Sequence, residues 1–229
     1  MLRVKKMKTE KKDTLNSSDV HDTSLIMESR EIFLRGGSSQ DEPAINHIVA
    51  EKFLINLRIL EQSGKDPIII HQQTVGGDWH SGICIYDAIK NSPCKFVFIC
   101  HGICASMGSI IAQAPFNKGV RVSMPNCEWL IHEGFCAVEG TYKQAFSLYE
   151  FEKKALEKSY DILGEVSQAS GSHFSNSKEG AAKRFIKKQL SSKEDWWLSP
   201  EEALDYGFVD GIFGKEGFES LDKIYKNVT

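Results

Sequence analysis

Apolar residues follow two different periods along this 229-residue chain. Between Glu42 and Gln62 they recur at the spacing of one helix face, which predicts an amphipathic helix. The runs Ile68–His71 and Lys95–Cys100 are short and rich in β-branched or aromatic residues, as in strands that are buried on both faces. Each run is followed by a predicted helix, over Trp79–Lys90 and Ser106–Gln113 respectively.

This close alternation of strands and helices predicts βαβ units, a mainly parallel sheet and right-handed crossovers. Four further short strands complete the predicted sheet: Glu31–Arg35, Val120–Ser123, Glu128–His132 and Phe208–Phe213. Another helix is predicted to start at Ser199-Pro200, because serine is a favourable N-cap and proline fits the first helical position. The predicted fold class is therefore α/β.

A long helical pattern from Gly140 to about Gln168 interrupts this alternation. Its apolar positions stand among many charges, and its length exceeds what a compact domain usually needs. The pattern predicts an arm that packs on another subunit, and an amphipathic helix covering its own sheet is the alternative. A polar loop over 169–180 and a short basic helix over 181–190 are predicted to follow.

The two ends of the chain differ from its centre. Residues 1–28 are polar, locally basic and without periodicity, which favours a flexible segment over a binding arm. Residues 29–215 are expected to form one folded domain, and residues 216–229 a C-terminal tail.

Composition narrows the class of protein. With 41% hydrophobic and 26% charged residues, the chain can bury a core, and its net charge of -3 favours neither nucleic acid nor an anionic membrane. No stretch reaches the roughly 20 apolar residues that span a bilayer, and no apolar signal core begins the chain, which predicts a cytoplasmic protein. The six cysteines are then expected to be reduced and buried. The sequence contains neither paired cysteine motifs of the metal-binding kind nor a glycine-rich phosphate loop, so neither a metal nor another cofactor is predicted.

Three segments that could carry chemistry come directly after predicted strands, where open α/β sheets place their sites. The pair Gly76-Gly77 lets the backbone bend sharply and approach a ligand. Ser106 stands at a predicted helix start, where N–H groups favour developing negative charge. His132 ends an apolar strand.

Each segment also has a purely structural explanation: a tight turn, a helix cap and an ordinary hydrogen-bonded histidine. A serine hydroxyl needs a neighbouring base to become a useful nucleophile. His132 and His101 are the histidines best placed at strand ends, and His101 is the poorer candidate because it lies in the same strand exit as Ser106. Locally, Ser106 therefore remains either a cap or a nucleophile.

In their order along the chain, these motifs resemble the Clp protease proteolytic subunit, ClpP. The matching segments are Gly76-Gly77, 81–87, 105–108, Pro125-Asn126, Ile131-His132 and the late block 195–210. Each motif is modest, but their ordered combination is specific and extends from about Ser24 to Phe213. The resemblance implies the ClpP/crotonase-like fold, in which the residues from Gly140 onward form a protruding handle helix.

The same resemblance implies a catalytic site. Ser106 matches the nucleophile, His132 the general base and Asp195 the acid that orients the histidine. Gly77 and Met107 match the positions whose backbone N–H groups form the oxyanion hole.

The implied activity is that of a serine endopeptidase that cleaves unfolded polypeptides inside a homo-oligomeric ring, a heptamer or double heptamer. Extended peptides would lie beside the segments of Gly76 and Gly134, adding a strand to the sheet. Such peptidases usually receive their substrates from a hexameric AAA+ Clp ATPase. The N-terminal segment does not reproduce the family's axial gate, so this partnership stays open.

The chain departs from the family pattern at three places. Val75 replaces a proline, Glu133-Gly134 replaces Gln-Pro after the base, and Glu194 replaces the arginine that forms an inter-ring ion pair. These departures suggest a divergent relative, of the phage type, and leave the ring number open. Two other functions stay open: an acyl-CoA enzyme on the crotonase fold, and a catalytically inactive ClpP-like ring subunit.

Overall fold

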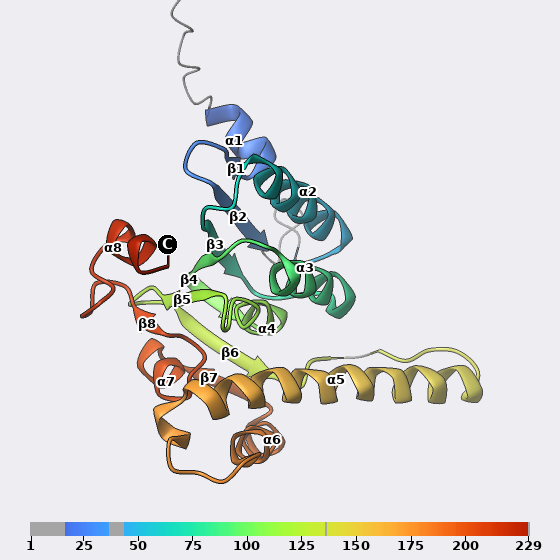
Figure 1. The fold of residues 1–229 in the computed structure, drawn as a ribbon. Coiled ribbons are helices and arrows are strands. Elements are labelled where there is room, and N and C mark those ends of the chain that lie inside the picture. The colour runs from blue at the N-terminus through green and yellow to red at the C-terminus, as the bar shows by residue number, and fades with distance from the viewer. Residues whose placement is uncertain (1–16, 37–43, 136, 229) are drawn as a thin grey trace, which may run out of the picture.

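The computed structural model describes residues 17–36, 44–135 and 137–228 (Figure 1). Within these residues, eight strands form one sheet: β1 (Leu25–Ile26), β2 (Glu31–Gly36), β3 (Ile68–Thr74), β4 (Phe96–Ala105), β5 (Gly119–Ser123), β6 (Glu128–His132), β7 (Asp195–Leu198) and β8 (Gly211–Ile212). Only β1 and β7, which each pair with a single neighbour, run antiparallel within this described part. The predicted α/β fold with a mainly parallel sheet is confirmed.

Helices cover the sheet on both faces. They are α1 (Ser17–Thr23), α2 (His47–Ser63), α3 (Trp79–Asn91), α4 (Met107–Ile111), α5 (Tyr142–Ser170), α6 (Ala181–Lys193), α7 (Pro200–Asp205) and α8 (Leu221–Val228), with a short 3₁₀ turn, η1 (Ser172–Phe174). Residues of α2, α3 and α4 pack with the inner faces of β2, β3 and β4 in the main core. On the opposite face, Ile224 and Val228 of α8 pack against Ile69, Val97 and Ile99.

Strand β4 is the centre of the sheet and changes partners along its length. Its first half pairs with β5, and its last three residues pair with β6. Between the halves, three residues, 101–103, form an irregularity in the pairing with β3, and Gly102 has a φ of 58°. This irregularity lets β4 continue beyond the predicted end at Cys100 and carry its carboxyl end to β6.

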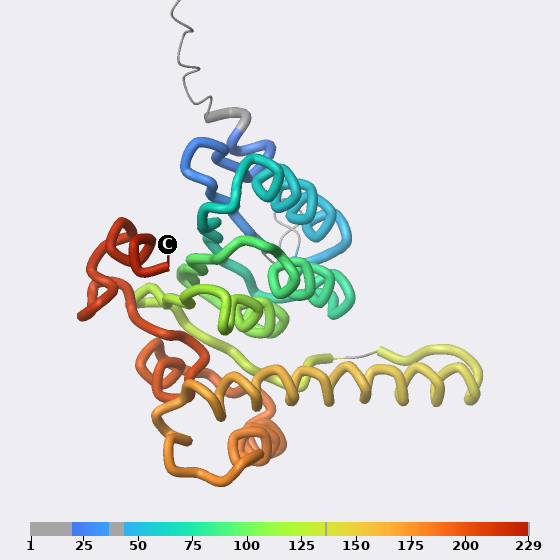
Figure 2. The backbone as a smooth tube through the Cα atoms, in the orientation of Figure 1, coloured from blue at the N-terminus to red at the C-terminus, as the bar shows by residue number. Residues whose placement is uncertain are grey.

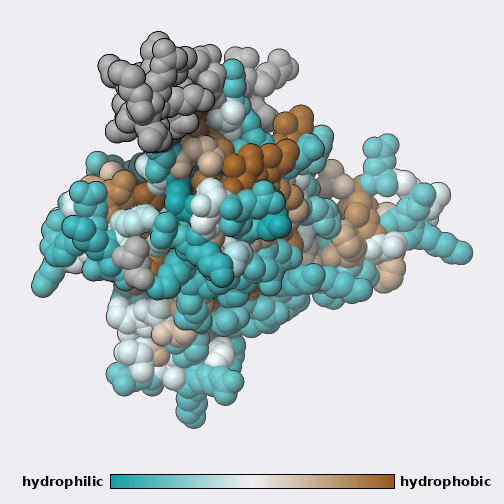
Figure 3. All heavy atoms as spheres, turned by 45° about the horizontal axis from the view of Figure 1, so that its top comes forward, coloured by the Kyte–Doolittle hydropathy of each residue, from teal (hydrophilic) through white to brown (hydrophobic). Residues whose placement is uncertain are grey.

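Helix α5 projects well beyond the sheet (Figures 1 and 2). It begins with a capping box at Thr141 and Gln144, and its buried residues lie between Ala155 and Ser167. Figure 3 shows apolar side chains gathered on the projecting half. Tyr142 and Phe146 are 98% and 67% exposed there. The long helix predicted from Gly140 is confirmed.

Several elements differ from those predicted. The described part of 1–28 contains α1 and β1, and the last segment, 216–229, contains α8. Phe208–Phe213 forms only the two-residue strand β8, and the loop over 169–180 contains η1. Helix α7 does begin at Pro200, with Ser199 as its N-cap and Glu202 completing a capping box, as predicted.

A buried ion pair fastens the end of the domain to the sheet. Arg121 on β5 is fully buried, and Asp210 accepts hydrogen bonds from its backbone N–H at 2.8 Å and from its Nε at 3.1 Å. Gln113 accepts a further bond from the guanidinium at 2.7 Å. Because every charged atom finds a partner, the guanidinium can be buried at acceptable cost.

The cysteines do not all follow the prediction. Four of the described cysteines are buried and free. Cys84 is exposed, because it lies on the face of α3 that is turned away from the core. Cys136 lies outside the described residues. No group of three potential metal ligands occurs in the described part of the chain. Among the same residues, no helix is long and apolar enough to cross a membrane.

Candidate active site

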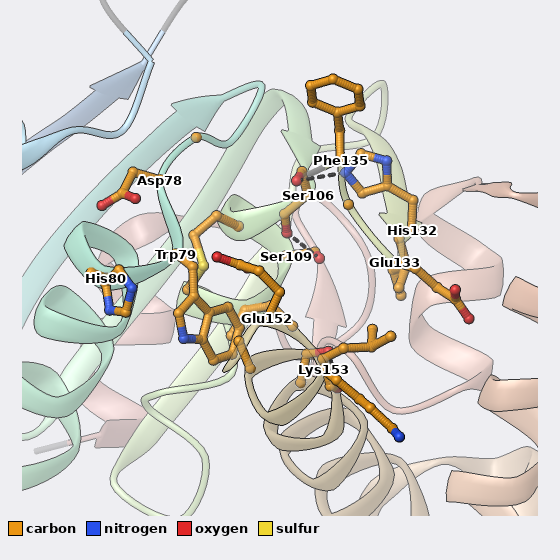
Figure 4. Close-up of a pocket in the computed structure, with 18 of the residues that line it drawn as sticks. Asp78, Trp79, His80, Ser106, Ser109, His132, Glu133, Phe135, Glu152 and Lys153 are labelled. Atoms are coloured by element: carbon orange, nitrogen blue, oxygen red, sulfur yellow. Dashed lines mark hydrogen bonds between the residues drawn. The ribbon is translucent and has the colours of Figure 1, made fainter. Parts of the chain in front are cut away.

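Adjacent strand ends bring three distant parts of the chain together. Ser106 follows β4, His132 ends β6, and Asp195 begins β7. Strand β6 pairs with both neighbours, so the carboxyl ends of β4 and β6 lie beside the start of β7. The three residues proposed from the resemblance therefore meet at one edge of the sheet, as Figure 4 shows for Ser106 and His132.

Ser106 has an unusual backbone conformation, with φ 53° and ψ −122°. Such a conformation is strained for any residue with a Cβ and persists only where the surroundings hold it. Here the Ser106 N–H donates to the Leu130 carbonyl at 2.9 Å, which ties the turn to β6. The Ser106 side chain makes no capping hydrogen bond to α4, so the helix-cap explanation does not describe its geometry.

The Ser106 hydroxyl instead meets the histidine. His132 Nε2 lies 2.7 Å from Ser106 Oγ, and His132 Nδ1 lies 3.3 Å from Asp195 Oδ1. In the antiparallel pairing of β6 and β7, His132 stands directly opposite Asp195, so both side chains leave the same face. The Asp195 side chain is 54% exposed and that of His132 26%.

The Gly76-Gly77 turn lies against the serine. Gly76 has a φ of 100°, and a Cβ added to it would lie 2.6 Å from the Ser106 Cβ, so only glycine permits this approach. The Ile45 N–H donates a hydrogen bond to the Gly76 carbonyl, and the Asp78 N–H donates one to the Ile45 carbonyl, both at 2.8 Å. Gly76 C=O and Gly77 N–H belong to one trans peptide group and point in opposite directions, so the Gly77 N–H faces away from Ile45. Gly77 itself lines the pocket described next.

A pocket of about 700 Å³ opens beside the serine. Its walls include Ser106, His132, Gly77, Met107 and Gly134. The described residues that line it do not include Gly76, which lies behind the serine. Four of the five oxyanion-hole and catalytic candidates thus face one cavity, and the fifth, Asp195, reaches it through the histidine.

Glu133, next to the histidine, is held away from it. The Tyr160 hydroxyl of α5 donates to Glu133 Oε1, and Figure 4 shows the Glu133 side chain turned away from Ser106. Burial, together with this carboxylate, raises the pKa of Tyr160, so the phenol stays protonated and keeps donating. The sequence offered no signal for this contact, because the two residues are separated by 27 positions and lie on different elements.

His101, the other histidine considered, belongs to a different cluster. Its Nε2 lies 3.0 Å from His71 Nδ1, and His71 Nε2 lies 3.0 Å from Glu31 Oε2. Burial, and then the neighbouring His71, lowers the pKa of His101. His101 is not among the described residues that line the pocket.

A serine, a histidine and a carboxylate that contact one another in this order beside a pocket are the arrangement of serine hydrolases, and this is the class to which the fold and the site point. Comparison with known proteins narrows it. The family described as Clp protease matches residues 15–216. The chain therefore belongs to the Clp protease family, which confirms the predicted family and the enzyme class, a serine-type endopeptidase.

Individual relatives agree with this assignment. The ATP-dependent Clp protease proteolytic subunit 3 of Parasynechococcus marenigrum (strain WH8102) is 31% identical over 177 residues, 77% of this chain and 79% of the relative. The ATP-dependent Clp protease proteolytic subunit of Porphyromonas gingivalis is 29% identical over 201 residues, 88% of this chain and 81% of the relative. A solved mutant of ClpP1 from Listeria monocytogenes superposes with a TM-score of 0.67 at 26% identity, covering 86% of this chain and 96% of that one. The ClpP-type fold is confirmed.

Proposed function

We propose that this chain cleaves peptide bonds by a Ser-His-Asp mechanism, with Ser106 as nucleophile, His132 as general base and Asp195 as the residue that orients the histidine. The observation that carries the proposal is the unbroken series of contacts from Ser106 Oγ through both imidazole nitrogens to Asp195 Oδ1, at 2.7 Å and 3.3 Å. A structural serine or histidine would not need this order of partners beside an open pocket.

In the first half of the reaction, Ser106 Oγ attacks the carbonyl carbon of the scissile bond while His132 Nε2 takes the hydroxyl proton. Asp195 keeps the other imidazole proton on Nδ1 and stabilises the imidazolium that forms. The carbonyl oxygen becomes an oxyanion, and the N–H groups of Gly77 and Met107 are the proposed donors to it. Gly77 supports this role because it lines the pocket and its N–H faces away from Ile45.

In the second half, the imidazolium gives its proton to the leaving amine as the C–N bond breaks, which leaves an acyl ester on Ser106. Water then attacks this ester, again with His132 as the base, and the C–O bond to Ser106 breaks. The products are a free carboxylic acid and the regenerated hydroxyl. The atoms and electrons of both half-reactions balance without an oxidant, a metal or a cofactor.

The proposed substrate is an unfolded polypeptide that lies extended between the Gly76-Gly77 segment and Gly134, adding its backbone to the sheet edge. We further propose a self-assembled homo-oligomeric ring, in which the projecting half of α5 packs on another subunit. The exposed Tyr142, Phe146 and Tyr149 of this helix support the proposal, because clustered apolar side chains on a surface mark contacts with other proteins. A hexameric AAA+ Clp ATPase is the proposed source of unfolded chains.

Labelling with a fluorophosphonate probe tests the nucleophile. Wild-type protein is expected to label, Ser106→Ala to remain unlabelled, and Ser159→Ala, a serine that lines the same pocket, to label as wild type does. Equal labelling of the Ser106→Ala variant would overturn the assignment.

Turnover separates the remaining alternatives. Hydrolysis of an unfolded protein that disappears in Ser106→Ala excludes an inactive ring subunit, whereas tight acyl-CoA binding without cleavage would favour the crotonase-type function. Electron microscopy of the purified protein gives the number of subunits in the ring.

A further inference from the structure

The pocket beside Ser106 contains one carboxylate, that of Glu152, with no hydrogen-bond or ion-pair partner among the described residues. Glu152 comes from α5 and is partly buried. Figure 4 shows its side chain reaching from the helix into the space between Trp79 and Ser109. A carboxylate that is partly removed from water, without a cation to compensate it, is unfavourable unless something else supplies the charge.

The other acidic groups of the pocket are already occupied. Asp78 caps α3, and its Oδ1 accepts from the Ser81 N–H at 2.8 Å and from the Ser81 hydroxyl at 2.6 Å. Glu133 accepts from Tyr160 and turns away from the serine. Neither carboxylate therefore competes with Glu152 for a positively charged group that enters the pocket.

The cations of the pocket do not neutralise Glu152 either. Lys153 points away from the pocket in Figure 4, and its Nζ lies 4.0 Å from Glu150 of the same helix. His80 stacks on Phe151, with ring centroids 5.3 Å apart. His132 is engaged with the serine. The charged residues lining the described pocket thus leave a net negative charge near Glu152.

The walls around Glu152 suit a long side chain that ends in a cation. Ile110 and Leu156 are apolar and offer contact to a methylene stem, as arginine and lysine stems prefer. Trp79 contributes an aromatic ring, whose face attracts guanidinium and ammonium groups. A pocket of about 700 Å³ is large enough for either side chain.

We propose that Glu152 makes this cavity a specificity pocket for arginine or lysine, so that the chain prefers to cleave peptide bonds on the carboxyl side of these residues. The inference rests on the proposed function, since it needs an acyl group on Ser106. The substrate cation would pair with Glu152, its stem would contact the apolar wall, and an acidic side chain would be repelled.

The test compares fluorogenic tetrapeptide amides that differ only in the residue before the aminocoumarin: arginine, its uncharged isostere citrulline, leucine and glutamate. We expect kcat/KM for arginine to exceed that for citrulline by about ten- to a hundredfold, the usual effect of one partly buried charged contact. Glu152→Gln should bring the two rates together while leucine hydrolysis persists, which reports that the protein is folded.

Glu165→Gln is the matched control, because Glu165 carries the same charge on the same helix, is exposed and does not line the pocket. It should leave the preference for arginine unchanged. Equal rates for arginine and citrulline in wild type, with Ser106 still labelled by a fluorophosphonate, would overturn the specificity and leave the proposed function standing. An equal loss of preference in Glu165→Gln would also overturn it. Failure of Ser106 to label would remove the proposed function itself.

Discussion

The weakest contact of the proposed triad gives the sharpest prediction. Asp195→Asn removes the charge that faces the imidazolium of His132, at 3.3 Å, and leaves the volume unchanged. At this separation, the attraction between unit charges is about 1 kcal/mol in water and about 5 kcal/mol at the effective dielectric of a protein surface pair. Because the Asp195 side chain is 54% exposed, the lower half of this range applies. We expect kcat to fall by about ten- to a hundredfold.

The assay is steady-state hydrolysis of a fluorogenic peptide together with the rate of fluorophosphonate labelling. Both should fall in Asp195→Asn, and neither should change more than about twofold in Glu194→Gln, which neutralises the adjacent carboxylate. An unchanged kcat in Asp195→Asn would refute the orienting role. A loss as large as that of Ser106→Ala would refute the electrostatic reasoning, since it would mean that the carboxylate works in a dry environment.

Three further changes test the surroundings of the site and the fold. Gly76→Ala should cut hydrolysis by about a hundredfold and lower Tm, because its Cβ would lie 2.6 Å from that of Ser106; activity near wild type would contradict the close packing. Asp210→Asn leaves buried Arg121 uncompensated and should cost about 3 kcal/mol, or roughly 6–12 °C in Tm by calorimetry, whereas a shift under a degree would contradict it. The hydrogen bond with His71 lowers the pKa of Glu31 below 4.5 in the folded state. Its contribution to stability is therefore complete above pH 4.5 and is lost as the pH falls through the lower pKa of the folded state. The free energy of unfolding, measured with urea, should fall less on acidification in Glu31→Gln than in wild type, and an equal fall would contradict this contribution.

Much of the fold could be predicted because the apolar periods were clear. The helices at 47–63 and 79–91 and the strand at 128–132 formed almost as expected, since each has a strong period and a recognisable end. The extension of β4 could not be predicted, because His101-Gly102 resembles a strand end and becomes an irregularity only through pairing with β3 and β6. Helix α8 was missed although Leu221, Ile224 and Val228 have helical spacing, because the segment is short and polar overall.

The site was less accessible from the sequence. Ser106 could be found as a serine between a strand and a helix, but its strained backbone and its missing cap bond exist only in three dimensions. Asp195 had no local signal and was reached through the family resemblance. Glu152 was hidden in the charged pattern of a long helix, where a carboxylate usually faces solvent. Contacts between distant elements are what local periodicity cannot reveal.

The burial of apolar residues in β7 determines which carboxylate lies beside His132. In β7, Trp196 and Leu198 are 2% and 3% exposed and face the core, which leaves Asp195 on the opposite face beside His132. A slip of one residue in the β6–β7 register would turn Asp195 toward the core and place the Trp196 indole beside the imidazole. Burying a carboxylate and exposing an indole are both costly, so the register is strongly determined. Precise alignment of the triad therefore depends on the packing of Trp196, which does not line the pocket.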